Sequence, residues 1–196
     1  KVARSSMVLL KNDGAVLPLK GEEKIAIVGP AADSRSEMVG TWPGFADYSK
    51  PVSFYEGLKA RFPHNAISVE KGCGFFDPID GGIAKAVAAA RGADVVFMTL
   101  GLPNSYSGEA ASMTNIDIPA AQKALFKAVK ATGKPVVILL VTGRPMTIAE
   151  ENEAADGLLV TWHPGIMAGT ALADIVSGDF NPSGRLTMTF PDVRTD

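Results

Sequence analysis

Short runs of apolar, β-branched residues recur along the chain, and they constrain its fold more than any other feature. Four of them, residues 25–29, 94–101, 135–143 and 157–162, are apolar on both alternate faces, and residues 66–70 form a weaker fifth. Strands of this kind are buried on both sides, as in a parallel sheet that lies between two layers of helices. The pattern therefore predicts a mainly parallel sheet.

Helical patterns separate these runs. Residues 82–91, 119–132 and 169–177 show them, and each is followed directly by a glycine. Strands that alternate with helices of these lengths imply right-handed crossovers. We therefore expect an α/β fold with a mainly parallel sheet of about six strands sandwiched between helices. After a turn-rich stretch at 179–184, the alternating run 185–190 is expected to add an antiparallel edge strand.

Composition sets the broad class of the protein. Of its 196 residues 46% are apolar or aromatic, which is enough for one sizeable core. The 19 Lys and Arg against 21 Asp and Glu leave a net charge of −2, with no positive excess for a phosphate backbone or a lipid surface. We expect neither nucleic acid nor membrane as a partner. One cysteine and two histidines exclude an internal disulfide and Cys- or His-rich metal sites, so no metal or cofactor is expected.

Ligands of open α/β sheets lie beyond the carboxyl ends of the strands, which directs attention to the loops that follow them. No glycine-rich phosphate loop and no serine nucleophile elbow is present. The loop at 102–119 carries one acidic residue before position 117, Glu109, which is either a general acid or a solvated loop side chain. Glycoside hydrolysis takes two carboxylates, and Asp33, Glu37 and Asp47 are the candidates for a partner within the chain.

Aromatic residues and one histidine complete the candidate site. Trp42 and Tyr106 lie on ligand-end loops and are of the type that stacks on the apolar face of a sugar ring. Trp42 could equally anchor its loop on the domain. His163 follows the last apolar run, where it is either a turn residue or a base for a serine.

Several blocks of sequence together resemble a known family. They are SSMVLLKNDGAVLPL near the start, IAIVGPAADS at the first strand, GEAASMTNIDIPAAQKALFKAVKATGKPVVILLVTGRPMTI in the middle and ALADIVSGDFNPSGRLTMTFP near the end. In this order they are similar to the C-terminal α/β sandwich domain of glycoside hydrolase family 3, most of all to that of its bacterial periplasmic β-glucosidases. The resemblance covers nearly the whole chain.

The resemblance implies a function that is shared between two domains. Family members are retaining enzymes that remove single sugars from the non-reducing end of β-linked glycosides, in the periplasm or outside the cell. An N-terminal barrel supplies their aspartate nucleophile, and the glutamate acid/base falls on Glu109. Residues 1–22 are then expected to be the connecting helix and linker from that barrel, and residues 23–196 the sandwich domain. Trp42 falls in a loop that shapes the sugar subsites, and the 196 residues alone are expected to be inactive.

The chain departs from the family pattern at two positions. Met113 stands where relatives often have arginine, and Met167 lies in a turn that often carries a glutamate. If both charges were exchanged together, the two methionine side chains should touch, within about 4.5 Å. These changes also keep an alternative open, namely a noncatalytic carbohydrate-binding or scaffolding domain with a decayed site. A nucleotide-binding domain rests on analogy of fold alone.

Overall fold

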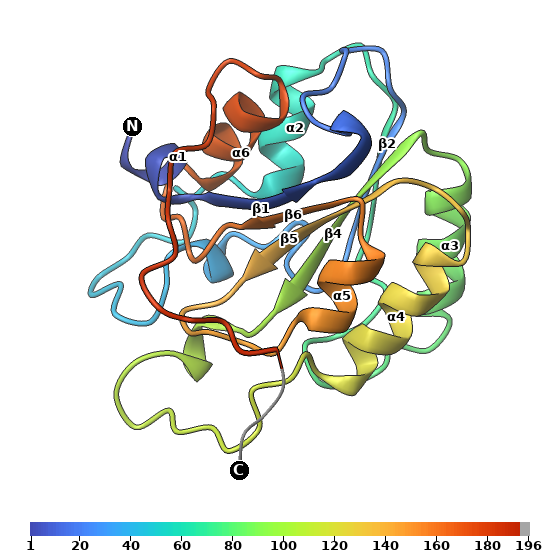
Figure 1. Cartoon of the computed structure of the whole chain (residues 1–196). Helices are drawn as coiled ribbons and strands as arrows, with labels where there is room; N and C mark the ends of the chain where they lie inside the picture. The colour runs from blue at the N-terminus through green and yellow to red at the C-terminus, as the bar shows by residue number, and fades with distance from the viewer. Residues whose placement is uncertain (193–196) are drawn as a thin grey trace.

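A six-stranded sheet runs through the middle of the structure, a computed structural model that describes residues 1–192 (Figure 1). Its strands are β1 (Val8–Asn12), β2 (Ile25–Val28), β3 (Ile67–Glu70), β4 (Val95–Gly101), β5 (Val136–Val141) and β6 (Gly157–Val160). They lie in the order β1-β6-β5-β4-β2-β3, with β1 antiparallel to β6 and all other neighbours parallel. The α/β fold with a mainly parallel sheet is confirmed.

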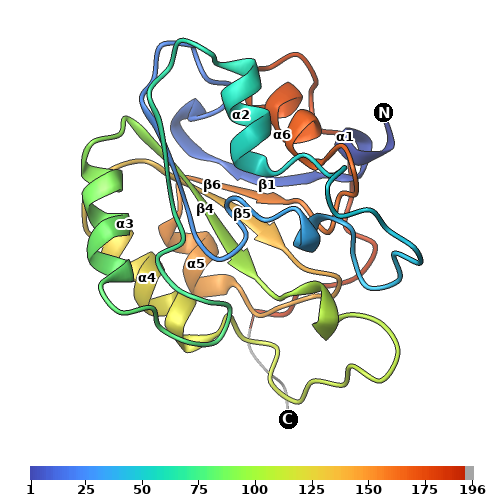
Figure 2. The same cartoon turned by 180° about the vertical axis from the view of Figure 1, so that it is seen from behind.

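Helices cover both faces of this sheet. They are α1 (Val2–Ser6), α2 (Phe54–Arg61), α3 (Gly82–Arg91), α4 (Ala120–Lys130), α5 (Ala149–Ala154) and α6 (Ala168–Val176). Helices α1, α2 and α6 lie on one face and α3, α4 and α5 on the other, as the two opposite views show (Figures 1 and 2). Within residues 1–192, no helix has the length and apolar content that a membrane span requires.

The burial of β5 explains why its sequence does not alternate. Every residue of this strand is buried, and successive side chains enter two different cores. One core lies under α3, α4 and α5, and the other lies under α2 and α6. Each buried Val, Leu or Ile side chain stabilises the fold by about 1.5–3 kcal/mol relative to an exposed one. The strands therefore hold the sheet between two apolar layers, which fixes where their ends and loops lie.

The antiparallel edge strand is formed near the start of the chain, whereas the sequence predicted it near the end. Residues 185–190 form no strand, so this prediction is wrong, and β1 pairs with β6 at that edge instead. Leu186 and Phe190 pack on the core, where the Phe190 ring meets Trp162 edge-on at 5.9 Å between ring centroids. The sheet thus takes a strand from residues 1–22, the segment expected to be only a connection.

Candidate active site

Long loops leave the carboxyl ends of the parallel strands on one side of the domain. The loop after β2 (light blue) and the loop after β4 (yellow-green) project together from this side in both views (Figures 1 and 2). Parallel strands end at the same edge of their sheet, so residues far apart in sequence meet there. This edge is where Glu109, Trp42 and Tyr106 were expected, and all three lie on its loops.

Glu109 and Trp42 lie on loops that are in direct contact. Gly108, the neighbour of Glu109, has φ +96°, a conformation that favours glycine. A β-carbon at Gly108 would lie 2.8 Å from Cγ2 of Thr41 and 3.0 Å from Nε1 of Trp42. The two loops can approach this closely only because position 108 has no side chain. The exposed Glu109 carboxyl group therefore follows directly after the contact with Trp42.

The aromatic side chains at this edge remain open to solvent. Trp42 is 73% exposed, which does not support the alternative that it anchors its loop on the domain. Tyr106 is 39% exposed and pairs with Phe76, with 4.7 Å between their ring centroids. Sequence reasoning missed Phe76, although two adjacent phenylalanines after β3 could have pointed to it. The edge thus offers exposed aromatic rings on the Glu109 loop and on the loop that contacts it.

Hydrogen bonds join the loops after β2 and β4. The Thr41 hydroxyl donates to the carbonyl oxygen of Asn104 at 2.6 Å. The backbone N–H of Asn104 donates to Oε2 of Glu37, also at 2.6 Å, and its side-chain amide donates to the carbonyl of Ser36 at 3.1 Å. A charged acceptor makes the Asn104–Glu37 bond the strongest of these contacts. These bonds therefore tie the loop that carries Trp42 to the loop that carries Glu109.

The three carboxylates considered as partners of Glu109 have local roles. Glu37 accepts from Asn104, and Asp33 accepts from the Ser53 hydroxyl at 2.5 Å. Asp47 accepts from the hydroxyl and the backbone N–H of Ser49, and these bonds hold the pKa of Asp47 below its usual value. These loop contacts, and not a pairing with Glu109, are what the structure shows for them.

His163 lies on the loop after β6 and is half-buried against the loop after β2. Its Nδ1 lies 2.7 Å from the carbonyl oxygen of Glu37, and because a carbonyl only accepts, Nδ1 carries the proton. Burial lowers the pKa of His163, and the hydrogen bond to Glu37 opposes this only in part. A β-carbon at Gly143 would lie 2.3 Å from Oγ of Ser107 and 3.5 Å from Cδ2 of His163. Ser107 Oγ and His163 Nε2 have no hydrogen-bond partner among residues 1–192, so the serine–base alternative is not formed.

Arg144 supports the segment that follows Glu109. It comes from the loop after β5, and its guanidinium donates to the carbonyl oxygen of Ala111. The Thr142 hydroxyl donates to the Arg144 carbonyl at 2.8 Å and fixes the turn. Sequence reasoning missed this arginine, and the signal was its place just after a buried strand, in TGRP. All the loops around Glu109 are thus tied by hydrogen bonds to a neighbour.

The two methionines that depart from the family pattern have different surroundings. Met113 packs against the core under α3, α4 and α5, where it lines a hollow with Phe76 and Ile118. Met167 is 50% exposed and lies at the start of α6, on the other face of the sheet. These positions give no support to the expected contact between them.

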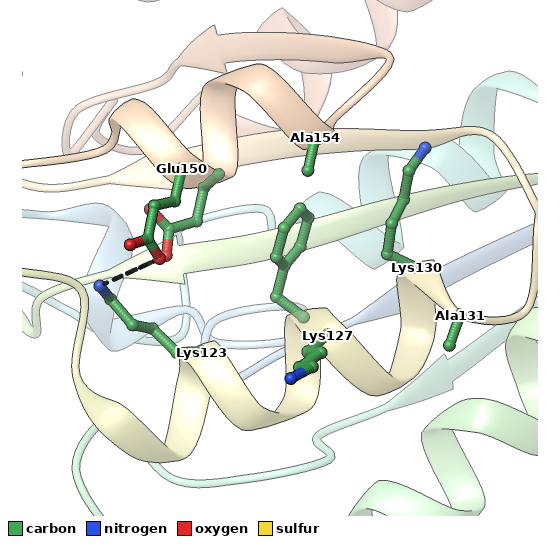
Figure 3. Close-up of a pocket in the computed structure, with 8 residues that line it drawn as sticks. Lys123, Lys127, Lys130, Ala131, Glu150 and Ala154 are labelled. Carbon is green, nitrogen blue, oxygen red and sulfur yellow. Dashed lines mark ion pairs between the residues drawn. The ribbon is translucent and has the colours of Figure 1, made fainter.

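A separate hollow of about 510 Å³ lies between α4 and α5. Figure 3 shows Lys123 of α4 reaching toward Glu150 of α5, with Lys127 and Lys130 further along α4. Glu151 also lines this hollow, and its side chain is buried 3.9 Å from the Lys123 ammonium. Burial raises the pKa of Glu151 above its ordinary value. This hollow is built from helix surfaces and not from the loops around Glu109.

Comparison with known proteins places the chain among glycoside hydrolases. A periplasmic beta-glucosidase of Salmonella typhimurium is 42% identical over 212 residues, an alignment that covers 97% of this chain and 28% of that protein. A beta-xylosidase of Formosa agariphila is 35% identical, in an alignment that covers 97% of this chain and 27% of that protein. The crystal structure of a beta-glucosidase from Listeria innocua in complex with isofagomine is similar to this chain, with a TM-score of 0.91 and 39% sequence identity. The match covers 97% of this chain and 26% of the Listeria chain.

The chain thus spans about a quarter of the length of the relatives it matches. The family model that it fits describes the glycosyl hydrolase family 3 C-terminal domain and covers residues 7–196. This range includes β1, which fits the position of that strand in the sheet. The chain belongs to the glycosyl hydrolase family 3 C-terminal domain family.

Proposed function

We propose that this domain provides the acid/base glutamate, Glu109, of a retaining exo-β-glycosidase of the β-glucosidase type. An N-terminal barrel of the same polypeptide provides the aspartate nucleophile. The observation that carries the proposal is the placement of Glu109 next to the contact between Gly108 and the exposed Trp42, at the ligand edge of a family 3 domain. The reaction uses two carboxyl groups, one from each domain, and needs no metal and no cofactor.

Glu109 acts in both steps of the reaction. In its protonated form it donates to the glycosidic oxygen as the bond to the aglycone breaks, and in its ionised form it then takes a proton from the attacking water. Retaining enzymes hold their two carboxyl groups about 5–5.5 Å apart. An exposed position on a projecting loop suits this task, because the nucleophile approaches from another domain.

The substrate is a β-linked oligosaccharide or glycoside. Trp42 and Tyr106 present ring faces on which the apolar face of a sugar can stack, and both rings are exposed in this domain. The named activities of the relatives include those of a beta-glucosidase and a beta-xylosidase, so we assign a terminal glucose or xylose to the substrate. The name of the Salmonella relative favours the periplasm as the place of action.

The test is Glu109→Gln in a polypeptide that joins this domain to its barrel. General acid catalysis contributes about 10²–10⁴-fold, so turnover of a β-glucoside with a poor leaving group should fall by that factor. A substrate with an activated leaving group should still form the glycosyl-enzyme, and added azide should then release a β-glycosyl azide. Glu150→Gln, an exposed glutamate on α5, is the control and should keep full activity.

Two results would count against the proposal. Full turnover of the poor substrate by the Glu109→Gln variant would exclude Glu109 as the acid. Binding of glycosides without turnover by the unmodified two-domain protein would instead favour a noncatalytic carbohydrate-binding domain.

A further inference from the structure

We infer that His163 is a positioning residue that sets the distance between the Trp42 loop and the Glu109 loop. Its hydrogen bond is to Glu37 and not to Trp42 or Glu109. It acts through the loop after β2, because its Nδ1–H donates to the carbonyl oxygen of Glu37 at 2.7 Å. The importance of the distance rests on the proposed function, whereas the linkage itself rests on the structure alone.

The linkage runs through short hydrogen bonds. The Glu37 carboxylate accepts from the Asn104 N–H at 2.6 Å, and the Asn104 carbonyl accepts from the Thr41 hydroxyl at 2.6 Å. Thr41 and Trp42 then pack against Gly108, where a β-carbon would lie within 3.0 Å of both. A displacement of Glu37 therefore moves the carboxylate that binds Asn104, on the Glu109 loop. Through the Asn104 carbonyl it also moves the Thr41 hydroxyl beside Trp42.

Within residues 1–192, the contact with Glu37 is the one hydrogen bond of the His163 ring. Its side chain is half-buried, and its Nε2 atom is enclosed with no hydrogen-bond partner among residues 1–192. Without the Nδ1–H donor, the carbonyl oxygen of Glu37 would lose its hydrogen-bond partner in this part-buried contact, which costs free energy. A residue that only forms a turn would not need this donor. The imidazole is thus placed for a single hydrogen bond.

A second contact makes the inference testable without unfolding the loops. The backbone N–H of Gly165 donates to the carbonyl oxygen of Met38 at 2.6 Å, next to Glu37 in the chain. This bond joins the same two loops and does not depend on the side chain at position 163. Replacing His163 should therefore shift the Glu37 segment and leave the loops attached.

The experiment uses the nuclear Overhauser effect between the Trp42 indole N–H and the α-protons of Gly108. The chain has two tryptophans, so the Trp42 signal is assigned with Trp42→Phe, and the Trp162 signal serves as an internal control. His163→Phe keeps the ring and removes the donor, and the effect should be lost or fall several-fold. His163→Asn places an N–H at the position of Nδ1 and should restore it. His64→Phe changes the only other histidine, which is exposed, and should have no influence.

Each outcome decides the inference. An effect of full intensity in His163→Phe would overturn it, as would a loss that His163→Asn does not restore. If His163→Phe does not fold, Glu37→Met breaks the next link, and full intensity there would overturn the inference in the same way. The NMR measurement does not depend on turnover, so it separates this inference from the proposed function.

Activity gives the second readout, in the polypeptide that includes the barrel. A misplacement of about 1 Å between groups in an active site can lower the rate by up to 10²-fold. His163→Phe should lower kcat/KM for a β-glucoside by about ten- to a hundredfold, and His163→Asn should recover most of it. Unchanged kcat/KM in His163→Phe, in an enzyme that depends on Glu109, would contradict the positioning role.

Discussion

The indole nitrogen of Trp42 lies 3.0 Å from the point that a β-carbon on Gly108 would occupy. Any side chain at position 108 would therefore push against the tryptophan and against Thr41. Glu109 follows one residue later, so this contact brings the loop of the acid next to the loop of the aromatic ring.

Gly108→Ala should separate the two loops. The change adds strain at φ +96° and a clash with Thr41 and Trp42. Gly21→Ala is the matched control, because Gly21 has φ +95° and no atom within 4 Å of its would-be β-carbon. Strain alone should lower the free energy of unfolding by about 1–3 kcal/mol in both variants. In the two-domain protein only Gly108→Ala should lower kcat/KM well below that of the unmodified enzyme; equal losses in both variants would show that the contact has no role.

Replacement by alanine should destabilise the fold at Trp162 but not at Trp42. Trp42 is 73% exposed, so Trp42→Ala should change the free energy of unfolding by less than about 0.5 kcal/mol while weakening glycoside binding. The Trp162 indole donates to the carbonyl of Ser6 at 3.1 Å and packs on Phe190. Trp162→Ala should therefore lower the free energy of unfolding by more than about 1 kcal/mol. Chemical denaturation of both variants checks this, and a strongly destabilised Trp42→Ala would contradict it.

The fold was largely predictable because its four central strands are buried on both faces. Strands β2, β4, β5 and β6 stand out as apolar runs and β3 does so more weakly, and their alternation with helices indicates parallel pairing. Strand β1 was missed because its five residues include Lys11 and Asn12 and their burial is mixed. Helix α2 was missed although Ser53 and Glu56 form a capping box, which is a signal that sequence does carry.

The site was predictable only down to its loops. Parallel strands end together, so the sequence could place Glu109, Trp42 and Tyr106 at one edge. It could not show that Gly108 touches Trp42 or that His163 bonds to Glu37, because these contacts join residues more than 60 positions apart through irregular loops. Loop conformation of this kind has no periodic pattern in the sequence.

The stability of the domain should fall in weak acid because of His163. Burial lowers the pKa of His163 from its ordinary value of 6.5, so below that pH the unfolded chain binds a proton that the folded chain does not. The free energy of unfolding therefore decreases as the pH falls from about 7 toward the lowered pKa. His163→Asn should remove this part of the pH dependence, measured by urea denaturation, and His64→Asn should retain it. An unchanged slope in His163→Asn would show that His163 does not titrate in this way.

Glu151 should affect stability with the opposite sign. Burial raises its pKa above the ordinary 4.5, and the contact with Lys123 offsets this only in part. Between these two pKa values the folded chain binds the extra proton, so the free energy of unfolding falls as the pH rises through the raised pKa. Each unit of pKa difference corresponds to about 1.4 kcal/mol. Glu151→Gln should therefore gain stability relative to the unmodified chain as the pH rises from 4.5 through the raised pKa. Glu150→Gln removes the exposed neighbour that also faces Lys123. Its charge raises the pKa of Glu151 less than burial does, so this variant should show only a small part of the gain. The same pH dependence in both variants would contradict the role of burial.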